Sequence, residues 1–141
     1  MWTKSFSKIY PEVKKEAVWG LWKDVNHWPQ WDTELEYCKM ESEFIAGSQF
    51  MLKPIGGPKV KITLSEVVPN KTFTDYCRFF GATMHDIHEL EETTNGLRIT
   101  NTITVSGPLR FFWVHCVAKK ITASIPKNLD ALVRLARSSN A

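Results

Sequence analysis

The sequence lacks any long apolar run, and this absence excludes a membrane-spanning helix. No stretch of the 141 residues approaches the ~18–20 consecutive apolar residues that such a helix needs. The first ten residues alternate polar and apolar side chains and contain no apolar core of a secretory signal. We therefore expect a cytoplasmic protein without an integral membrane segment.

The sequence contains few cysteines and no large excess of positive or negative charge. The three cysteines Cys38, Cys77 and Cys116 are far apart and form no Cys-x-x-Cys pair, which predicts free thiols and no zinc site. Lys and Arg number 18 against 15 Asp and Glu, a net charge of +3. The basic residues are scattered rather than clustered, which argues against nucleic-acid binding. We expect no metal, no cofactor and a monomer or homodimer.

Aromatic side chains, in contrast, are plentiful, with six Trp, eight Phe and three Tyr. A chain of this length fits one domain, here residues 1–141, and can bury a core without disulfides. Most of these rings must therefore belong to the core or to the wall of a pocket.

Hydrophobic periodicity predicts an α+β domain. Residues 2–10 alternate as a strand, and residues 11–23 carry apolar side chains at helical spacing, with a short second helix before Pro29. Six strands with short, hairpin-length connections follow between residues 34 and 107. Residues 114–136 return to a helical period, and Pro126 should kink or split that helix. An antiparallel sheet with helices on one face is the expected architecture.

Several segments together resemble the START-like superfamily of polyketide cyclases/dehydrases and lipid-transport proteins (SRPBCC). These segments cover residues 18–25, 28–32, 44–48, 67–74, 96–100 and 105–109. The resemblance implies the helix-grip fold: a curved antiparallel seven-stranded sheet wrapped around a long C-terminal helix, with two short helices between strands 1 and 2. It also implies a deep, mostly apolar cavity between the sheet and the helix. Members of the superfamily include carriers, receptors and enzymes, so the function must be argued from the site.

Two polar side chains are expected on the inner face of the strand around residue 86. Asp86 and His88 share the parity of Met84 and Leu90, so they point the same way if those apolar residues line a cavity. A carboxylate beside an imidazole can raise its basicity for general acid/base catalysis. The pair could equally hold a ligand oxygen, or be a structural or surface ion pair. Asn101 is similarly a polar residue on an apolar stripe, either a ligand contact or a satisfied core residue.

A metal site at His85-x-x-His88 is not expected. Residues three apart on a strand point to opposite faces, so the two imidazoles cannot share an ion. The sequence also has no nucleophile motif of the Gly-x-Ser-x-Gly type.

The leading hypothesis is binding, and possible transport, of a small hydrophobic ligand such as a lipid, isoprenoid, quinone or aromatic polyketide. The first alternative is a cyclase or dehydratase that uses His88, oriented by Asp86, as general acid/base. The second is a domain that binds a protein partner, without a ligand and with its cavity filled by aromatic side chains. Trp113 would act either as a gate or as a packing residue. The expected ligand-binding residues are Tyr37, Leu52, Phe73, Cys77, Phe79, Met84, Asn101, Ile103, Trp113, Val117 and Ile121.

Overall fold

A computed structural model of the chain describes residues 1–139. Its seven strands form one antiparallel sheet in the order β1-β7-β6-β5-β4-β3-β2. The strands are β1 (Trp2–Tyr10), β2 (Leu35–Lys39), β3 (Gln49–Pro54), β4 (Val60–Val68), β5 (Thr72–Phe79), β6 (Ala82–Thr93) and β7 (Gly96–Ser106). The helical segments are α1 (Lys15–Lys23), η1 (Val25–Gln30), α2 (Arg110–Trp113), η2 (Val114–Ala118) and α3 (Lys119–Ser139).

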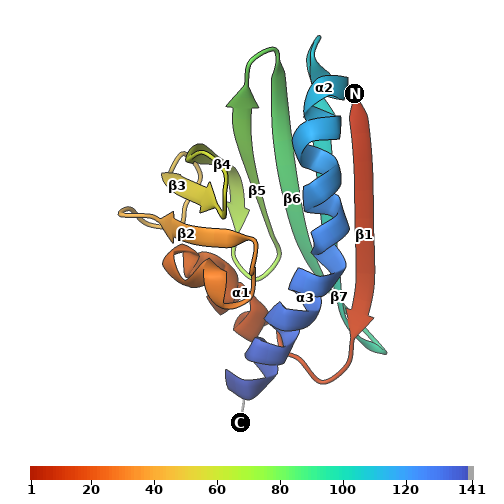
Figure 1. Ribbon diagram of the computed structural model, residues 1–141. Helices are drawn as coiled ribbons and strands as arrows, with labels where there is room; N and C mark the ends of the chain where they lie inside the picture. The colour runs from red at the N-terminus through yellow and green to blue at the C-terminus, as the bar shows by residue number, and fades with distance from the viewer. Residues whose placement is uncertain (140–141) are drawn as a thin grey trace.

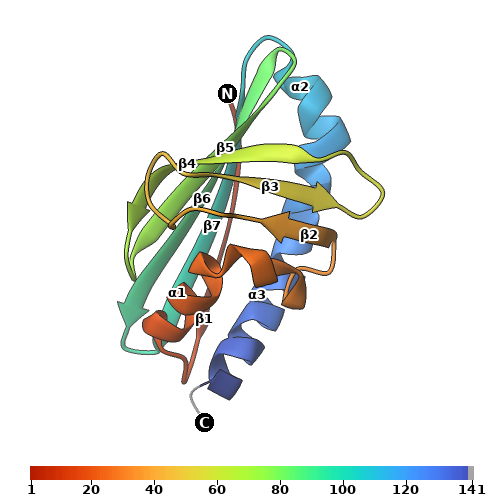
Figure 2. The same cartoon turned by 90° about the vertical axis from the view of Figure 1, so that its left-hand side faces the viewer.

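The C-terminal helical segment lies across one face of the curved sheet, as Figures 1 and 2 show. Strand β1 pairs with the last strand, β7, and α3 packs against both of them. Helices α1 and η1 connect β1 to β2 along the chain. Helix α1 packs against α3, and η1 packs against β2. This α+β arrangement is the helix-grip fold that the sequence predicts.

The first helix begins later than its periodicity predicts. The expected start was Pro11, but α1 begins at Lys15. Glu12 has a φ of 56°, in the left-handed region, so the chain turns there instead of continuing as a helix. The Arg137 guanidinium donates a hydrogen bond of 2.7 Å to the Pro11 carbonyl and ties this turn to α3. That contact is between residues far apart in the sequence, which local periodicity does not reveal.

Pro126 does not split the C-terminal helix. Helix α3 runs from Lys119 to Ser139 with Pro126 inside it. The irregular turn lies earlier, in the wider π-helical turn of η2, which carries the buried residues Val114 and Ala118. Thus the part of the prediction that allowed a division at the proline is wrong.

Phe73 on β5 is the centre of the aromatic core. Its side chain is fully buried, and its ring centroid lies 5.2 Å from that of Trp22 and 5.1 Å from that of Phe44. Trp19 and Trp28 approach the same ring at 6.1 and 6.3 Å. The tryptophans of the N-terminal helical segment are therefore core residues that hold α1 and η1 onto the sheet.

Gly96→Ala should destabilise the protein, whereas Gly20→Ala should not. Gly96 has a φ of 141°, and an added Cβ would lie 2.3 Å from the Tyr10 carbonyl oxygen, so the turn between β6 and β7 must shift. We expect urea denaturation to give a free energy of unfolding lower by more than about 1 kcal/mol. Gly20 lies inside α1 with no atom within 4 Å of such a Cβ, so alanine should add roughly 0.5–1 kcal/mol. Equal stability of the two variants would contradict this account.

Candidate functional site

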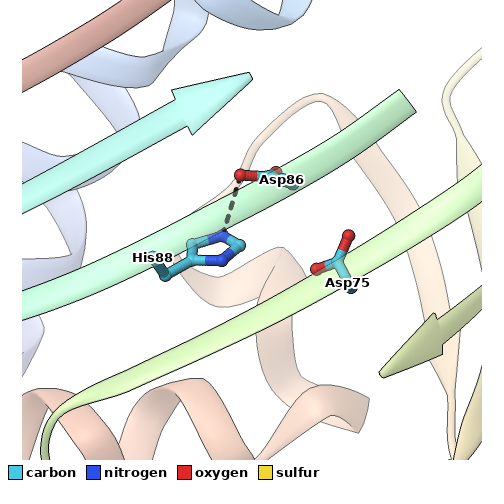
Figure 3. A group of neighbouring side chains, drawn as sticks. All are labelled: Asp75, Asp86 and His88. Atoms are coloured by element: carbon cyan, nitrogen blue, oxygen red, sulfur yellow. Dashed lines mark ion pairs between the residues drawn. The ribbon is translucent and has the colours of Figure 1, made fainter. Parts of the chain in front are cut away.

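Four polar side chains gather on the inner face of neighbouring strands. Asp75 lies on β5, Asp86 and His88 on β6, and Asn101 on β7. In the register, Asp75 is opposite Asp86 and His88 is opposite Asn101. Because side chains of a strand alternate between faces, all four point toward the interior. Figure 3 shows three of them, and we call the four residues the polar cluster.

Hydrogen bonds within the polar cluster determine which nitrogen of His88 carries the proton. The Nδ1 atom lies 3.3 Å from the Phe73 carbonyl oxygen, and a carbonyl can only accept, so Nδ1 is the donor. The other nitrogen, Nε2, lies 3.3 Å from Asp86 Oδ1. Asn101 Nδ2 donates to the same Asp86 oxygen and to the Ile87 carbonyl at 3.2 Å.

The surroundings of His88 favour the neutral imidazole. Its ring stacks on Phe73 with centroids 3.9 Å apart and planes within 8°, and the Trp22 ring meets it edge-on at 5.4 Å. Burial lowers the pKa of His88 from its usual value, and the nearby Asp86 only partly opposes this. In a neutral ring with the proton on Nδ1, the lone pair of Nε2 faces Asp86.

Asp75 is the least satisfied member of the polar cluster. It is 7% exposed, and burial, followed by repulsion from Asp86, raises its pKa well above the usual value. Among the described residues no hydrogen bond to its carboxyl group is found. Two carboxyl groups this close cannot both ionise easily. Asp75 therefore keeps its proton more readily than an ordinary aspartate and can act as a hydrogen-bond donor.

The polar cluster is short of donors for its acceptors. The Asp86 carboxylate and the Nε2 lone pair of His88 face each other, and Asn101 is the only side chain of the cluster with N–H groups directed at Asp86. Protons, a hydroxyl-bearing molecule or a cation would correct this shortage. The ligating atoms of Asp75, Asp86 and His88 lie within 4.8 Å of one another and could hold a metal ion. The expectation of no metal therefore stays a prediction.

Three further polar groups of the interior were missing from the sequence prediction. Burial raises the pKa of Asp32, the Asp86 charge raises it further, and the nearby Asn128 of α3 partly opposes this. The indole Nε1 of Trp31 is buried without a hydrogen-bond partner among the described residues. Asp75 itself could have been found from the sequence, because it lies between Phe73 and Cys77 at two-residue spacing and so shares their apolar face of β5. Asp32 and Asn128 lie outside the strands, where no alternation marks them.

Most expected wall residues lie on the elements that surround the polar cluster. The buried ones and the half-buried ones that pack against the core are Leu52, Phe73, Cys77, Phe79, Met84, Ile103, Trp113, Val117 and Ile121. Tyr37 is not one of them, and its place in the wall stays a prediction. A bulge between Leu35 and Tyr37 shifts the register, so that Tyr37 pairs with Lys53 and points away from the face that carries Cys38 and Leu52.

Trp113 closes one end of this interior. Its ring stacks on Phe79, with centroids 4.4 Å apart and planes within 13°. Its indole nitrogen donates a hydrogen bond of 2.7 Å to the Phe80 carbonyl. The two contacts join the start of the C-terminal helical segment to the far end of β5. Either role expected for Trp113, gate or packing residue, remains compatible with this position.

Two of the hollows on the described surface are defined by their lining residues, and neither is lined by the polar cluster or by α3, where the resemblance implies a cavity. The larger, about 430 Å³, lies between α1 and the turn after β4 and includes Trp19, Phe44 and Pro69. The smaller, about 280 Å³, lies on the outer face of the sheet. The side chain of Asp86 nevertheless keeps 24% of its surface exposed, so water reaches this edge of the cluster. Within residues 1–139, no helix is long and apolar enough to cross a membrane.

Comparison with known proteins identifies a family and a shared fold. The family model described as polyketide cyclase/dehydrase and lipid transport matches residues 7–137. No curated protein sequence matches the chain. The crystal structure of hypothetical protein jhp0584 from Helicobacter pylori is similar, with a TM-score of 0.77 and 16% identity over 96% of this chain and 88% of that one. That of TTHA0849 from Thermus thermophilus gives 0.74 and 14% over 99% and 100%.

A third similar structure is that of StfQ, a di-domain aromatase/cyclase from the steffimycin biosynthetic pathway. It has a TM-score of 0.76 and 10% identity, over 98% of this chain and 52% of that one. At these identities the three structures demonstrate a common fold and no more.

Asp75→Asn should stabilise the protein in a pH-dependent way. Because the folded-state pKa of Asp75 lies above its ordinary 3.8, its favourable contribution is complete below about pH 3.8 and is lost as the pH rises through the folded-state value. The side chain of the asparagine variant does not ionise, so its stability is not lowered in this way. Urea denaturation should give matching stabilities at low pH and a variant more stable by about 1–3 kcal/mol at neutral pH.

The control for this experiment is Glu66→Gln, which changes an exposed carboxylate on β4. Its stability relative to the wild type should hardly change with pH. If the free energy of unfolding of Asp75→Asn changes with pH in parallel with that of the wild type, the assignment of a protonated Asp75 is wrong.

Proposed function

Because the chain belongs to the polyketide cyclase/dehydrase and lipid transport family, we propose that it binds a small hydrophobic ligand between the sheet and α3. The ligand would be a lipid, an isoprenoid, a quinone or an aromatic polyketide. The single observation that carries the proposal is the polar cluster, a group of mostly buried side chains in which Asp75 has no hydrogen-bond partner among the described residues and two acceptors, Asp86 and Nε2 of His88, face each other.

The unmet hydrogen bonds suggest which part of a ligand would bind there. Burying a polar group without a partner costs free energy, so such groups are rare unless water or a ligand completes them. A protonated Asp75 offers a donor, and the indole N–H of Trp31 is a second buried donor without a partner. Asp86 and Nε2 of His88 offer acceptors. An apolar molecule with a carbonyl or hydroxyl oxygen would meet both needs, and this is the usual chemistry of a ligand pocket.

Access to the polar cluster would involve Trp113. The walls nearest the end of β5, Phe79 and Trp113, are half-buried and stacked on each other, so a ligand must separate them or enter beside Asp86. A gate of two rings that are not fully buried can open at a modest cost, because few core contacts are lost. The half-buried Val117 and Ile121, one and two helical turns further along, would then contact the apolar part of the ligand.

Catalysis is the second candidate function, and the tautomer of His88 supports it because Nε2 is free to accept a proton. With Nδ1–H donated to the Phe73 carbonyl, the basic Nε2 is directed into the interior. A bound β-carbonyl compound could lose a proton from carbon to Nε2 while Asp75 donates a hydrogen bond to the carbonyl oxygen, which is the activation needed for an aldol-type cyclisation. Asp86 would stabilise the imidazolium that forms.

Ligand binding can be tested with a matched pair of aromatic probes. Naphthoquinone carries carbonyl oxygens and naphthalene does not, although the ring systems are alike. Asp75→Val removes the donor, so we expect naphthoquinone affinity to fall about three- to tenfold, the value of one hydrogen bond. Naphthalene affinity should stay the same. Equilibrium dialysis measures both.

The control variant Cys116→Ala changes an exposed side chain outside the proposed walls and should affect neither probe. If neither aromatic probe binds, and native mass spectrometry of protein from its own host finds no apolar ligand, the pocket hypothesis fails. The partner-binding alternative would then be favoured.

His88→Gln separates the carrier from the enzyme. If the protein is an enzyme, the variant should lose dehydrative cyclisation of a linear poly-β-carbonyl thioester, measured as the loss of water by mass spectrometry. Its affinity for naphthoquinone should stay within a few-fold, because the amide retains a polar group at the same place. If the protein is a carrier, no turnover is seen in the wild type and His88→Gln changes affinity alone.

A further inference from the structure

Large apolar side chains are exposed together at one end of the molecule. Phe80 is 84% exposed, Phe111 64%, Phe112 56% and Leu109 40%. We call these four residues the aromatic tip. Isolated exposed apolar residues are ordinary, but several that adjoin one another mark an interaction site.

Two segments distant in sequence form the aromatic tip. Phe80 lies in the turn between β5 and β6, and the other three residues lie at or just before α2, at the same end of the molecule in both views (Figures 1 and 2). The backbone N–H of Leu109 donates to the Gly81 carbonyl at 2.9 Å. The Trp113 indole donates to the Phe80 carbonyl, and Phe112 packs edge-on against Trp113. The tip is therefore one continuous surface.

The charges around the aromatic tip have one sign. Arg78 precedes the turn, Arg110 lies over the Phe111 ring at 4.6 Å, and Lys119 and Lys120 lie about two helical turns after Phe112, at the start of α3. No Asp or Glu occurs between residues 93 and 129, nor between residues 76 and 85 of the β5–β6 hairpin. An apolar surface with a purely basic border is complementary to an anionic surface with an apolar interior.

The shape and the charge both argue against a second copy of the chain as the occupant. In a symmetric dimer the same patch meets itself, so the basic side chains of one copy would face basic side chains of the other. The most exposed ring, Phe80, is at the apex of a hairpin turn rather than in a groove. A lipid interface accepts protruding rings without a complementary shape, whereas a folded partner requires one.

We propose that the aromatic tip docks on the surface of a bilayer that contains anionic lipids. The phenyl rings enter the boundary between headgroups and acyl chains, and the basic side chains contact the headgroup phosphates and carboxylates. The docked end also carries the Phe79–Trp113 stack, so the end of the interior closed by these rings faces the membrane. The docking itself needs no bound ligand and so stands apart from the ligand-binding proposal.

Flotation with vesicles of phosphatidylcholine, with and without phosphatidylserine, tests the proposal. The wild type should bind the vesicles with phosphatidylserine, and binding should weaken as salt is added. The double variant Lys119→Gln/Lys120→Gln should bind about tenfold or more weakly, since each basic residue near such a surface contributes about a factor of five. Phe111→Ser/Phe112→Ser should weaken binding to a similar extent while leaving the far-ultraviolet circular dichroism unchanged.

Matched controls lie near α1, far from the aromatic tip. Lys14→Gln/Lys23→Gln makes the same change in net charge, and Ile45→Ser removes an exposed apolar side chain in the loop between β2 and β3. Both should bind vesicles as the wild type does. Equal losses in the control and tip variants, or no binding by the wild type, would overturn the proposal. So would a tip-dependent dimer in analytical ultracentrifugation without vesicle binding.

Asp75→Val distinguishes the two proposals of function. It should weaken naphthoquinone binding and leave vesicle binding intact, because Asp75 is buried on the inner face of β5, away from the aromatic tip. Vesicle binding without binding of either aromatic probe would support docking alone.

Discussion

The stacked contact between His88 and Phe73 is the interaction on which the rest of the structure depends. One face of the imidazole packs against the central ring of the aromatic core, and its Nδ1–H meets the backbone carbonyl of the same residue. The core thereby holds His88 neutral and in one tautomer. It also directs the other nitrogen toward Asp86. Without Phe73, neither the position of α1 over the sheet nor the chemistry of the polar cluster would be defined.

The polar cluster combines two opposing requirements. Its side chains are buried by the same sheet and helices that bury the aromatic core, so each unsatisfied group reduces stability. Yet their placement on adjacent strands makes them converge on one small volume, as binding or proton transfer requires. Natural proteins often accept lower stability at functional sites for this reason. A buried Asp75 that opposes Asp86 across a strand pair has no evident structural purpose, since removing either charge would relieve the repulsion.

The middle and the turn of the β5–β6 hairpin carry different kinds of side chains, and the two proposals rest on these two regions. Near its middle the hairpin presents Asp75, Asp86 and His88 to the interior. At its turn it presents Phe80 to the outside, next to the basic segment that begins at Arg110. The Phe79–Trp113 stack lies between these two regions. A molecule moving from an apolar phase to the polar cluster would therefore pass these rings first.

The sequence by itself determined the order of the elements, the α+β class and the inward direction of Asp86, His88 and Asn101, because alternation and helical spacing are local properties of the chain. Only the tertiary structure decided that α1 starts after Glu12 and that Tyr37 points away from the face that carries Cys38, since both depend on contacts or bulges between distant segments. It also decided that Asp75 opposes Asp86 and that Asp32 and Asn128 join them. Strand pairing and helix packing bring these residues together, and no spacing along the chain records such pairings.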